Sequence, residues 1–343
     1  MHTSSTAHYQ IFRDVPPLRQ ARKKELLQSR SVGFVPTLGA LHEGHLALMR
    51  QAARENESVY ISIFINPTQF GANEDLSTYP KTWDEDNAKL RNLDKELAAD
   101  SQYRGRIDVV FAPNDQVMYP GLPPTSDLQG HGSFVSITPL ASMLEGRSRP
   151  VFFRGVATVC MKLLNIIQPE NVYFGQKDIQ QVYVIKRMVE DFHLNSNVRV
   201  GPTVREDDGL ALSSRNVYLG SRRRKVATVL YRALTAIAQS VKKGVRDCET
   251  LCEVALRELR EEEQRQQSQQ TGRRAIFEVD YVSIADPRTL DELNEVDPKI
   301  GAVLSGAIKV LPLEGIDKGE DAGLGGGATL VRLIDNLIIE PKA

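Results

Sequence analysis

The chain has 343 residues, 41% of them hydrophobic, so it is long enough for two domains that each bury a core. Its formal net charge of −1 gives no general attraction to nucleic acid or anionic lipid, which argues against a polyanion-binding protein. There is no apolar signal core or apolar run near the roughly 20 residues of a membrane span, and Cys160, Cys248 and Cys252 are irregularly spaced, so we expect a cytoplasmic protein with free cysteines.

Short β-branched or aromatic runs alternate with amphipathic segments over the first two hundred residues. The predicted strands are SVGFVP (31–36), SVYISIFIN (58–66), RIDVVFAP (106–113) and ENVYFG (170–175). Helices are predicted between them at His42–Arg54, Trp83–Ala99, Val156–Ile167 and Asp178–Phe192. Such apolar runs are typical of strands buried on both faces of a parallel sheet. The alternation predicts a doubly wound α/β sheet, whose ligands bind beyond the carboxyl ends of its strands.

The character of the sequence changes near Val204. Two charged amphipathic helices are predicted at Arg222–Lys242 and Asp247–Gln267. Three strand candidates follow: FEVDYVSIAD (277–286), GAVLSGAIKV (301–310) and LVRLIDNLII (330–339). Helices followed by strands predict a smaller α+β domain over 204–343, after a first domain over 1–203.

Two segments of this second part have the composition of loops. The polar stretch 261–274 is predicted to be solvated, and the arginine-rich run 222–225 is predicted to be a solvated helix start. The glycine-rich stretch 313–329 invites a phosphate-loop interpretation, but Gly-Lys-Ser/Thr does not follow its glycines. We therefore expect a flexible hairpin connection there.

The stretch GFVPTLGALHEGHLALMR (33–50) places His42 and His45 where a strand passes into a helix. One interpretation is a metal site, but zinc-binding helices space two histidines by four residues, and no further ligands are clustered nearby. A second is a purely structural pair. The third is a site for anionic phosphate, since a helix start offers unpaired N–H groups and a partial positive charge. Gly39 and Gly44 would let a ligand approach closely, and imidazoles can donate to charge that develops on a phosphoryl group, so we favour phosphate.

PTLGALHEGH resembles the His-x-Gly-His signature of adenylate-forming nucleotidyltransferases. More narrowly, the chain resembles the pantoate–β-alanine ligase (pantothenate synthetase) family. The likeness continues, in the family's order, in IFINPTQFGANEDLSTYP, EGRSRPVFFRGVATV, YFGQKDIQQ and GLALSSRNVYL, with DYVSIADP and RLIDNLII matching its C-terminal domain. The motifs from Phe34 to Leu219 lie in register, which makes the resemblance specific.

The resemblance implies an ATP-dependent enzyme that joins pantoate to β-alanine. Pantoate would attack the α-phosphate of ATP to give pantoyl adenylate and pyrophosphate, and the amine of β-alanine would then displace AMP. The family also implies a Rossmann-like N-terminal domain, a small C-terminal lid and a homodimer. Mg²⁺ would be bound mainly through the ATP phosphates, and no protein ligand for it is predicted.

The matching motifs also imply roles for individual residues. Contacts with ATP are expected from Leu38, Gly39, His42, His45, Gly175, Gln176, Lys177, Asp178, Val204, Leu212, Ser213, Ser214 and Arg215. Among these, His42, His45, Lys177 and Arg215 would be catalytic, with His45 as the usual proton donor. Asn66, Gln69 and Gln181 would bind pantoate and β-alanine, with Tyr79, Glu145 and Arg149 near the substrates.

Simpler structural interpretations exist for several of these residues. The histidines can be a packed pair, Asp178 is placed as a routine helix cap, and Gln181 can be a solvated helix position. In contrast, Lys177 and the guanidinium fork of Arg215 suit phosphate well.

The sequence departs from the family at a few positions. Leu38 replaces the commoner Met, Gln176 stands where many members have Glu, and Phe152 replaces the His of many bacterial members. Phe cannot make the hydrogen bond of that histidine. Insertions near 95–106 and 312–328 are expected to lengthen surface connections.

Three other functions compete with this hypothesis. A related nucleotidyltransferase would keep the nucleotide in its product, whereas a ligase of this family releases AMP. A tRNA-charging enzyme would need a basic anticodon-binding segment, which the sequence lacks. An inactive nucleotide-binding protein would have lost its phosphate-contacting residues, yet the histidines, Lys177 and 213–215 are all present.

Overall fold

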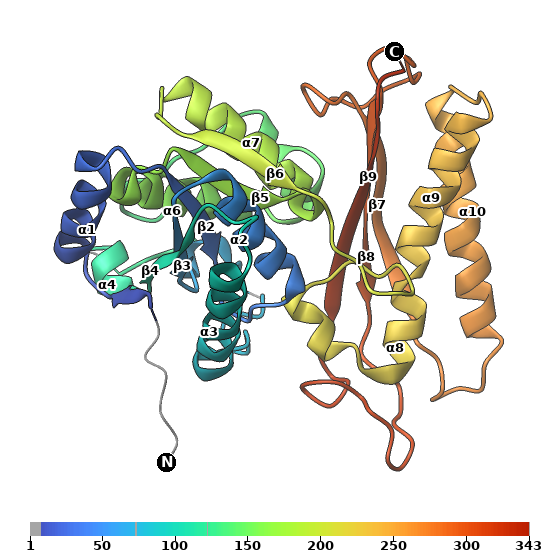
Figure 1. The fold of residues 1–343 in the computed structure, drawn as a ribbon. Coiled ribbons are helices and arrows are strands. Elements are labelled where there is room, and N and C mark those ends of the chain that lie inside the picture. The colour runs from blue at the N-terminus through green and yellow to red at the C-terminus, as the bar shows by residue number, and fades with distance from the viewer. Residues whose placement is uncertain (1–7, 73, 122, 343) are drawn as a thin grey trace. The chain divides into compact units, whose positions relative to one another are not determined.

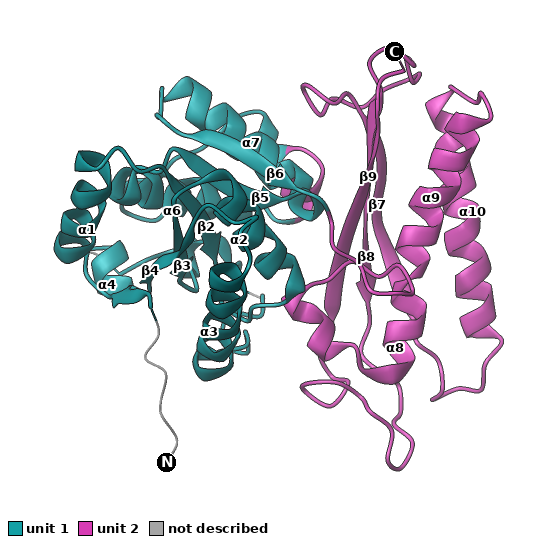
Figure 2. Cartoon of the chain, viewed as in Figure 1, with its two compact units in different colours: residues 1–142, 149–202 teal, residues 143–148, 203–343 magenta. Residues whose placement is uncertain are grey.

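The computed structural model describes residues 8–72, 74–121 and 123–342, which form two compact units. Unit 1 contains the chain up to Ser142 and Arg149–Pro202, whereas unit 2 contains Met143–Ser148 and the chain from Thr203 (Figure 2). The division after Pro202 lies one residue from the predicted boundary. Segment 143–148 falls within the predicted first domain, yet its contacts place it in unit 2.

Unit 1 is built on a six-stranded parallel sheet in the order β1-β4-β3-β2-β5-β6 (Figure 1). Its strands are β1 (Gln10–Phe12), β2 (Val32–Thr37), β3 (Ser58–Ile63), β4 (Arg106–Phe111), β5 (Asn171–Gly175) and β6 (Asn197–Gly201). This confirms the predicted doubly wound α/β fold.

Helices cover both faces of this sheet because successive strand residues point to opposite sides. Phe34 packs into a core with α1 (Val15–Leu27), α6 (Phe152–Ile167) and α7 (Ile179–Asp191). Its neighbour Val35 packs into the other core, which α2 (Glu43–Glu55) and α3 (Trp83–Ala99) cover. The short helix α4 (Asp115–Met118) follows β4.

The strand order defines where a ligand can bind. From β2 the chain moves outward through β3 to β4, and it then returns to place β5 on the opposite side of β2. Adjacent crossovers therefore leave β2 and β5 toward different faces, which opens a crevice beyond their carboxyl ends. The β2–α2 and β5–α7 turns flank this crevice.

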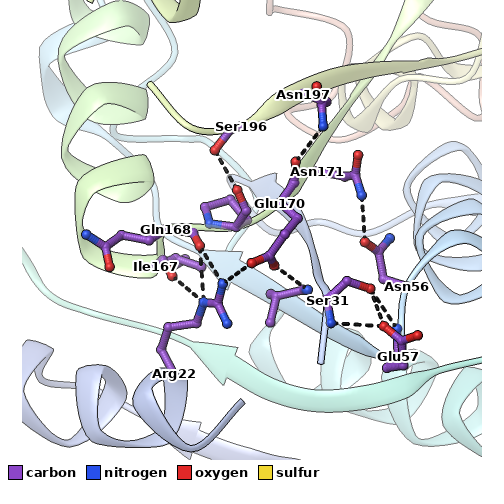
Figure 3. A network of polar contacts seen from close by, with 12 residues as sticks. Arg22, Ser31, Asn56, Glu57, Ile167, Gln168, Glu170, Asn171, Ser196 and Asn197 are labelled. Carbon is purple, nitrogen blue, oxygen red and sulfur yellow. Dashed lines mark hydrogen bonds and ion pairs between the residues drawn. The ribbon is translucent and has the colours of Figure 1, made fainter. Parts of the chain in front are cut away.

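A polar network closes the opposite edge, at the amino ends of the strands (Figure 3). The buried Arg22 of α1 donates to Gln168 O at 2.8 Å and to Glu170 Oε1 at 2.5 Å. Glu170 Oε2 accepts from Val32 N at 2.7 Å, and Asn171 donates to Asn56 at 2.7 Å. Since these side chains bind one another and the strand starts, this edge serves stability, and the carboxyl edge is left for chemistry.

Unit 2 packs helices against an antiparallel sheet in the order β7-β8-β9. Its strands are β7 (Phe277–Ala285), β8 (Ala302–Val310) and β9 (Val331–Ile339), and its helices are α5 (Glu145–Ser148), α8 (Gly220–Ala227), α9 (Val229–Lys242) and α10 (Cys248–Gln267). Leu230, Leu234 and Leu251 join Leu304 and Ile308 in one core. The predicted α+β arrangement is confirmed. The segment 313–329 connects β8 to β9, as expected, but hydrogen bonds to Val217 and Ser221 hold it against the rest of unit 2, so it is not the flexible connection that the sequence predicted.

Several local predictions were wrong. Helix α6 begins at Phe152 rather than Val156. The helix predicted over Asp247–Gln267 is confirmed by α10, so 261–267 belongs to this helix and not to the solvated loop predicted over 261–274, and Glu262 is buried there beside Arg232. The predicted helix 222–242 is divided between α8 and α9. The edge strands β1 and β6 and helix α1 were not predicted, since their patterns are short or largely polar.

Two sequence-wide expectations can be compared with the structure. Cys160, Cys248 and Cys252 are free. Within the described ranges, none of the helices combines the length and apolar character that crossing a membrane requires.

Candidate active site

The backbone of the β2–α2 turn, at the edge of the crevice, is fixed by hydrogen bonds to a carboxylate from α3. Asp86 is buried and accepts from Ala40 N at 2.9 Å and from Leu41 N at 2.7 Å. Gly39 has a φ of +85°, and a Cβ there would lie 3.2 Å from both Asp86 Oδ2 and an Ile63 methyl carbon. The turn therefore requires glycine for its backbone conformation as well as for space.

His42 and His45 cap the start of α2 reciprocally. His42 is the N-cap residue, and its Nδ1 accepts from Gly44 N at 3.2 Å. His45 Nδ1 accepts from His42 N at 3.3 Å, and the two ring centroids lie 4.1 Å apart. Because both Nδ1 atoms accept, each neutral ring carries its proton on Nε2. The pair thus supplies two Nε2–H donors at a helix start.

The protonation of these rings is set by their surroundings. Loss of hydration lowers the pKa of His42 to about 4, with a further lowering contribution from the positive charges of Lys177 and Lys89. Burial, His42 and the same two lysines hold the pKa of His45 well below 6.5. Both imidazoles are therefore neutral at physiological pH, so each has an Nε2–H that can donate a hydrogen bond, and the expected role of His45 as a proton donor stays a prediction.

The spacing His-x-Gly-His has a steric reason. A Cβ on Gly44 would lie 2.9 Å from His42 Cε1 and 3.0 Å from His42 Nδ1. Because Gly44 lies in the first turn of α2, any side chain there would push the His42 ring from its position.

The second turn at the crevice follows β5. Gly175 leads into a short 3-10 helix, η3 (Gln176–Asp178), which continues directly into α7. The Lys177 side chain is largely buried, and its Nζ lies 3.9 Å from Asp178 Oδ1. Lys177 is close enough to lower the pKa of both histidines, so the fold brings His42, His45 and Lys177 together, although they are far apart in sequence.

The predicted substrate amides after β3 differ in their surroundings. Asn66 is completely buried, and its amide donates to Gln69 Oε1 at 3.0 Å and to Gly155 O at 3.2 Å. Its Oδ1 accepts from Thr68 Oγ1 at 3.0 Å and from the Tyr119 hydroxyl. Asn66 therefore orients the Gln69 side chain inside the protein. Because Gln69 Oε1 accepts from Asn66, the group by which Gln69 can donate to a ligand is its Nε2.

The remaining predicted residues of unit 1 lie around these elements. Gln181 is partly exposed in the first turn of α7. Tyr79 is buried against Phe70, with ring centroids 5.8 Å apart. The Arg149 guanidinium pairs with Glu74, with Nε 2.9 Å from Oε1, and stacks 3.7 Å from the centroid of the Phe152 ring. Phe152, which replaces a histidine, thus holds an arginine in place.

Glu145 lies in unit 2 and has a structural partner there. Its Oε1 accepts from Arg332 Nη1 at 2.7 Å, and Arg332 also binds Asp280 at 2.8 Å. Ser148 Oγ donates to the same Asp280 at 3.0 Å. These bonds explain why 143–148 belongs to unit 2. The expectation that Glu145 lies near the substrates stays a prediction.

The other predicted ATP contacts are gathered on one hairpin of unit 2. Leu212 N donates to Val204 O at 3.0 Å, and Arg205 bridges to Ala211. Arg205 also binds Asp335 of β9 at 2.6 Å and 2.8 Å, which fastens the hairpin to the sheet. Beyond it, Ser213 Oγ accepts from Arg215 N at 3.3 Å and caps the short 3-10 helix η4 (Ser214–Tyr218).

A cavity of about 1070 Å³ adjoins the β2–α2 turn within unit 1. Leu38, Gly39, Phe64, Trp83 and Asp86 are among its lining residues, so it opens beyond the carboxyl ends of β2 and β3. Across the described ranges, no cluster of three or more His, Cys, Asp or Glu side chains could hold a metal ion. The described side chains alone therefore offer no cage for a divalent cation.

Sequence reasoning missed two residues that shape this site. Besides Asp86, Lys89 binds the β2–α2 turn by donating to Leu41 O at 2.5 Å. Both residues come from the first two turns of α3, where acidic residues such as Asp86 are ordinary near a helix start and a lysine is an ordinary helix residue. Only their position beside the β2–α2 turn distinguishes them, so the sequence contained no local signal for this role.

Comparison with known proteins identifies the family. The model of the family described as pantoate-beta-alanine ligase matches residues 10–338. A pantothenate synthetase of Roseiflexus castenholzii is 44% identical over 311 residues, which cover 90% of this chain and 93% of the relative. The pantoate–β-alanine ligase of Saccharomyces cerevisiae is 39% identical, with 96% of this chain and 99% of the relative covered.

Solved structures agree with this result. A pantothenate synthetase of Thermus thermophilus matches with a TM-score of 0.74 and 37% identity, over 95% of this chain and 98% of that structure. A ligase of Francisella tularensis, solved with β-γ ATP and β-alanine, matches with a TM-score of 0.63 and 29% identity over 97% and 100% of the two chains. With the family model, the relatives and the fold in agreement, the chain belongs to the pantoate–β-alanine ligase family.

Proposed function

We propose that the protein condenses pantoate with β-alanine at the expense of ATP, through a pantoyl-adenylate intermediate. The observation that carries this proposal is the pair of neutral imidazoles, each with an Nε2–H donor, grouped with Lys177 at the topological switch point. The Francisella relative was solved with an ATP compound and β-alanine, which supports the same substrates here.

In the first half-reaction, a carboxylate oxygen of pantoate attacks the α-phosphorus of ATP, and the bond to the pyrophosphate oxygen breaks. Negative charge shifts onto pyrophosphate and the α-phosphate oxygens, so catalysis rests on positioned donors. His42 and His45 donate Nε2–H bonds to this charge, and Lys177 adds a full positive charge. Neutral rings lose no proton in this role and need no base to reset them.

In the second half-reaction, the β-alanine amine attacks the acyl carbon of pantoyl adenylate. The bond from this carbon to the AMP oxygen breaks, the nitrogen gives up a proton, and an amide forms. Gln69 and Gln181 are proposed to orient pantoate through neutral hydrogen bonds, which leave its carboxylate nucleophilic. Asn66 is proposed to contribute by orienting Gln69, because the nitrogen and the oxygen of its own amide already make hydrogen bonds within the protein.

From the family resemblance, unit 2 is proposed to contribute contacts to the triphosphate. Its hairpin presents Ser213, Ser214 and Arg215 next to a capped helix start, and a guanidinium fork matches phosphate oxygens. Gly39, Gly175 and Val204 would contact the nucleotide through their backbone, and Asp178 would accept from its ribose. Mg²⁺ is proposed to arrive with the ATP phosphates, because this ion is usually bound through substrate phosphates and waters.

The assembly and location of the protein are also proposals. We infer a homodimer from the family resemblance, and light scattering of the purified protein tests it. We infer a cytoplasmic protein, which agrees with its free cysteines.

One incubation distinguishes this function from its rivals. With ATP, Mg²⁺, pantoate and β-alanine, we expect equimolar AMP, pyrophosphate and pantothenate, measured by chromatography and mass spectrometry. Pantoate alone should support exchange of labelled pyrophosphate into ATP, which reports the adenylate step. A product that retains the nucleotide, or turnover without AMP, would refute the assignment.

A further inference from the structure

The glycine-rich insertion 312–328, which joins β8 to β9, is docked rather than free. Its Asp321 O accepts from Ser221 N at 2.8 Å and from Ser221 Oγ at 3.2 Å. Leu324 N donates to Val217 O at 2.8 Å. The insertion therefore contacts the segment 217–223, which includes the end of η4 and the start of α8.

The docked backbones approach so closely that glycine is required. A Cβ on Gly323, whose φ is +77°, would lie 2.4 Å from Tyr218 O and 2.6 Å from Tyr218 C. A Cβ on Gly220, whose φ is +61°, would lie 2.5 Å from Asp321 O. Glycines on both partners thus allow a tight contact between two main chains.

Two arginines predicted to be solvated complete this contact. Arg222 binds Glu320 with Nε 2.8 Å from Oε1 and donates to Gly315 O at 3.1 Å. Arg223 is 0% exposed, and its guanidinium donates to Leu219 O at 3.2 Å, Thr329 O at 2.6 Å and Tyr218 O. The run 222–225 does lie at a helix start and Lys225 is exposed, but the prediction of solvation was wrong for Arg222 and Arg223, because the insertion and the η4–α8 junction supply acceptors for both.

The segment that receives the insertion continues directly from the proposed phosphate loop. Arg215 lies two residues before Val217, within the same short helix η4. We propose that the insertion 312–328 positions Ser213–Arg215 for the triphosphate by fixing the carboxyl end of η4. This inference rests on the proposed function, and it makes Arg222, Arg223 and Glu320 positioning residues rather than catalytic ones.

The physical argument is one of preorganisation. The Val204–Leu212 hairpin holds one end of this loop, and Tyr218 and Leu219 pack in the core at its other end. Docking of the insertion adds main-chain contacts at that second end, which fix the backbone of 217–223. Phosphate contacts depend on placement within about an ångström, and misplacement of that size costs up to about 10²-fold in rate. The expected effect is therefore on ATP rather than on pantoate.

A matched pair of glycine substitutions tests the proposal. Gly323→Ala adds a methyl group against Tyr218 O, whereas Gly319→Ala, at a similar φ of +81°, has no neighbouring atom within 4 Å. Both variants carry the same left-handed strain, so their difference isolates the docking contact. We measure the KM for ATP and for pantoate by pyrophosphate exchange, together with the melting temperature. Gly323→Ala should raise the KM for ATP about tenfold and leave that for pantoate within about twofold, and Gly319→Ala should match wild type.

The outcomes separate positioning from simple stabilisation. A lower melting temperature with an unchanged KM for ATP would show a merely structural insertion and overturn the proposal, as would equal ATP kinetics in both variants. Glu320→Gln provides a milder test if Gly323→Ala fails to fold, because it removes the charge that Arg222 pairs with and keeps an amide oxygen that can still accept from Asp317 N. It should raise the KM for ATP severalfold, and no change would also overturn the proposal. Absence of exchange in the wild-type enzyme would instead refute the proposed function, and this inference with it.

Discussion

Gly44→Ala should separate catalysis from stability. The new Cβ would lie 2.9 Å from His42 Cε1, and carbon atoms in contact prefer at least about 3.5 Å, so the ring must retreat by roughly 0.6 Å. Alanine is favoured over glycine within a helix by up to about 1 kcal/mol, so the fold should be as stable as wild type or more so. Displacement of one transition-state donor by this distance should reduce pyrophosphate exchange at least about tenfold.

A double-mutant cycle shows whether the effect passes through His42. Exchange rates are measured for wild type, Gly44→Ala, His42→Ala and the double variant, with thermal unfolding of each as a control. If the methyl group acts by moving the His42 ring, Gly44→Ala should have almost no further effect once that ring is removed. Additive losses in the cycle, or full activity in Gly44→Ala, would refute the steric explanation of the motif.

Three further predictions concern the same crevice. His45→Ala should reduce pantoate-dependent pyrophosphate exchange by at least about 10²-fold, and unchanged exchange would remove His45 from the mechanism. Gln69→Ala should raise the KM for pantoate more than that for ATP, and equal weakening would indicate a structural role. The free energy of unfolding should fall as the pH drops from about 6.5 toward 4, because unfolded histidines bind protons that folded His42 and His45 do not. Urea unfolding at several pH values should show this slope, at most about 1.4 kcal/mol per pH unit for each histidine. A His42→Gln/His45→Gln variant should have a shallower slope between about pH 6.5 and 5, and the remainder comes from carboxylates such as Asp280, whose pKa the fold lowers.

Features with a local chemical signal were predictable from the sequence. The alternation of buried strands and amphipathic helices predicted the parallel sheet, because side-chain period reflects which faces an element buries. The pattern around His42 and His45 also placed both residues at a helix start, as the structure has them, whereas the anion site inferred from that position stays a prediction. Family motifs then attached roles to individual residues, which the mutations above test.

Features that depend on distant partners were decided only by the tertiary structure. Arg223 is of a residue type that usually lies on the surface, yet it is buried, and its guanidinium donates to the carbonyl oxygens of Leu219 and Thr329. Asp86 has the position of an ordinary helix cap but holds the β2–α2 turn, and Glu145 pairs with Arg332, which is far along the chain. The edge strands β1 and β6 were missed because half-exposed edges need little apolar sequence. A buried charge or a short edge strand is stabilised by neighbours that are close in space but distant in sequence. The residues next to it in the sequence therefore do not reveal its partner.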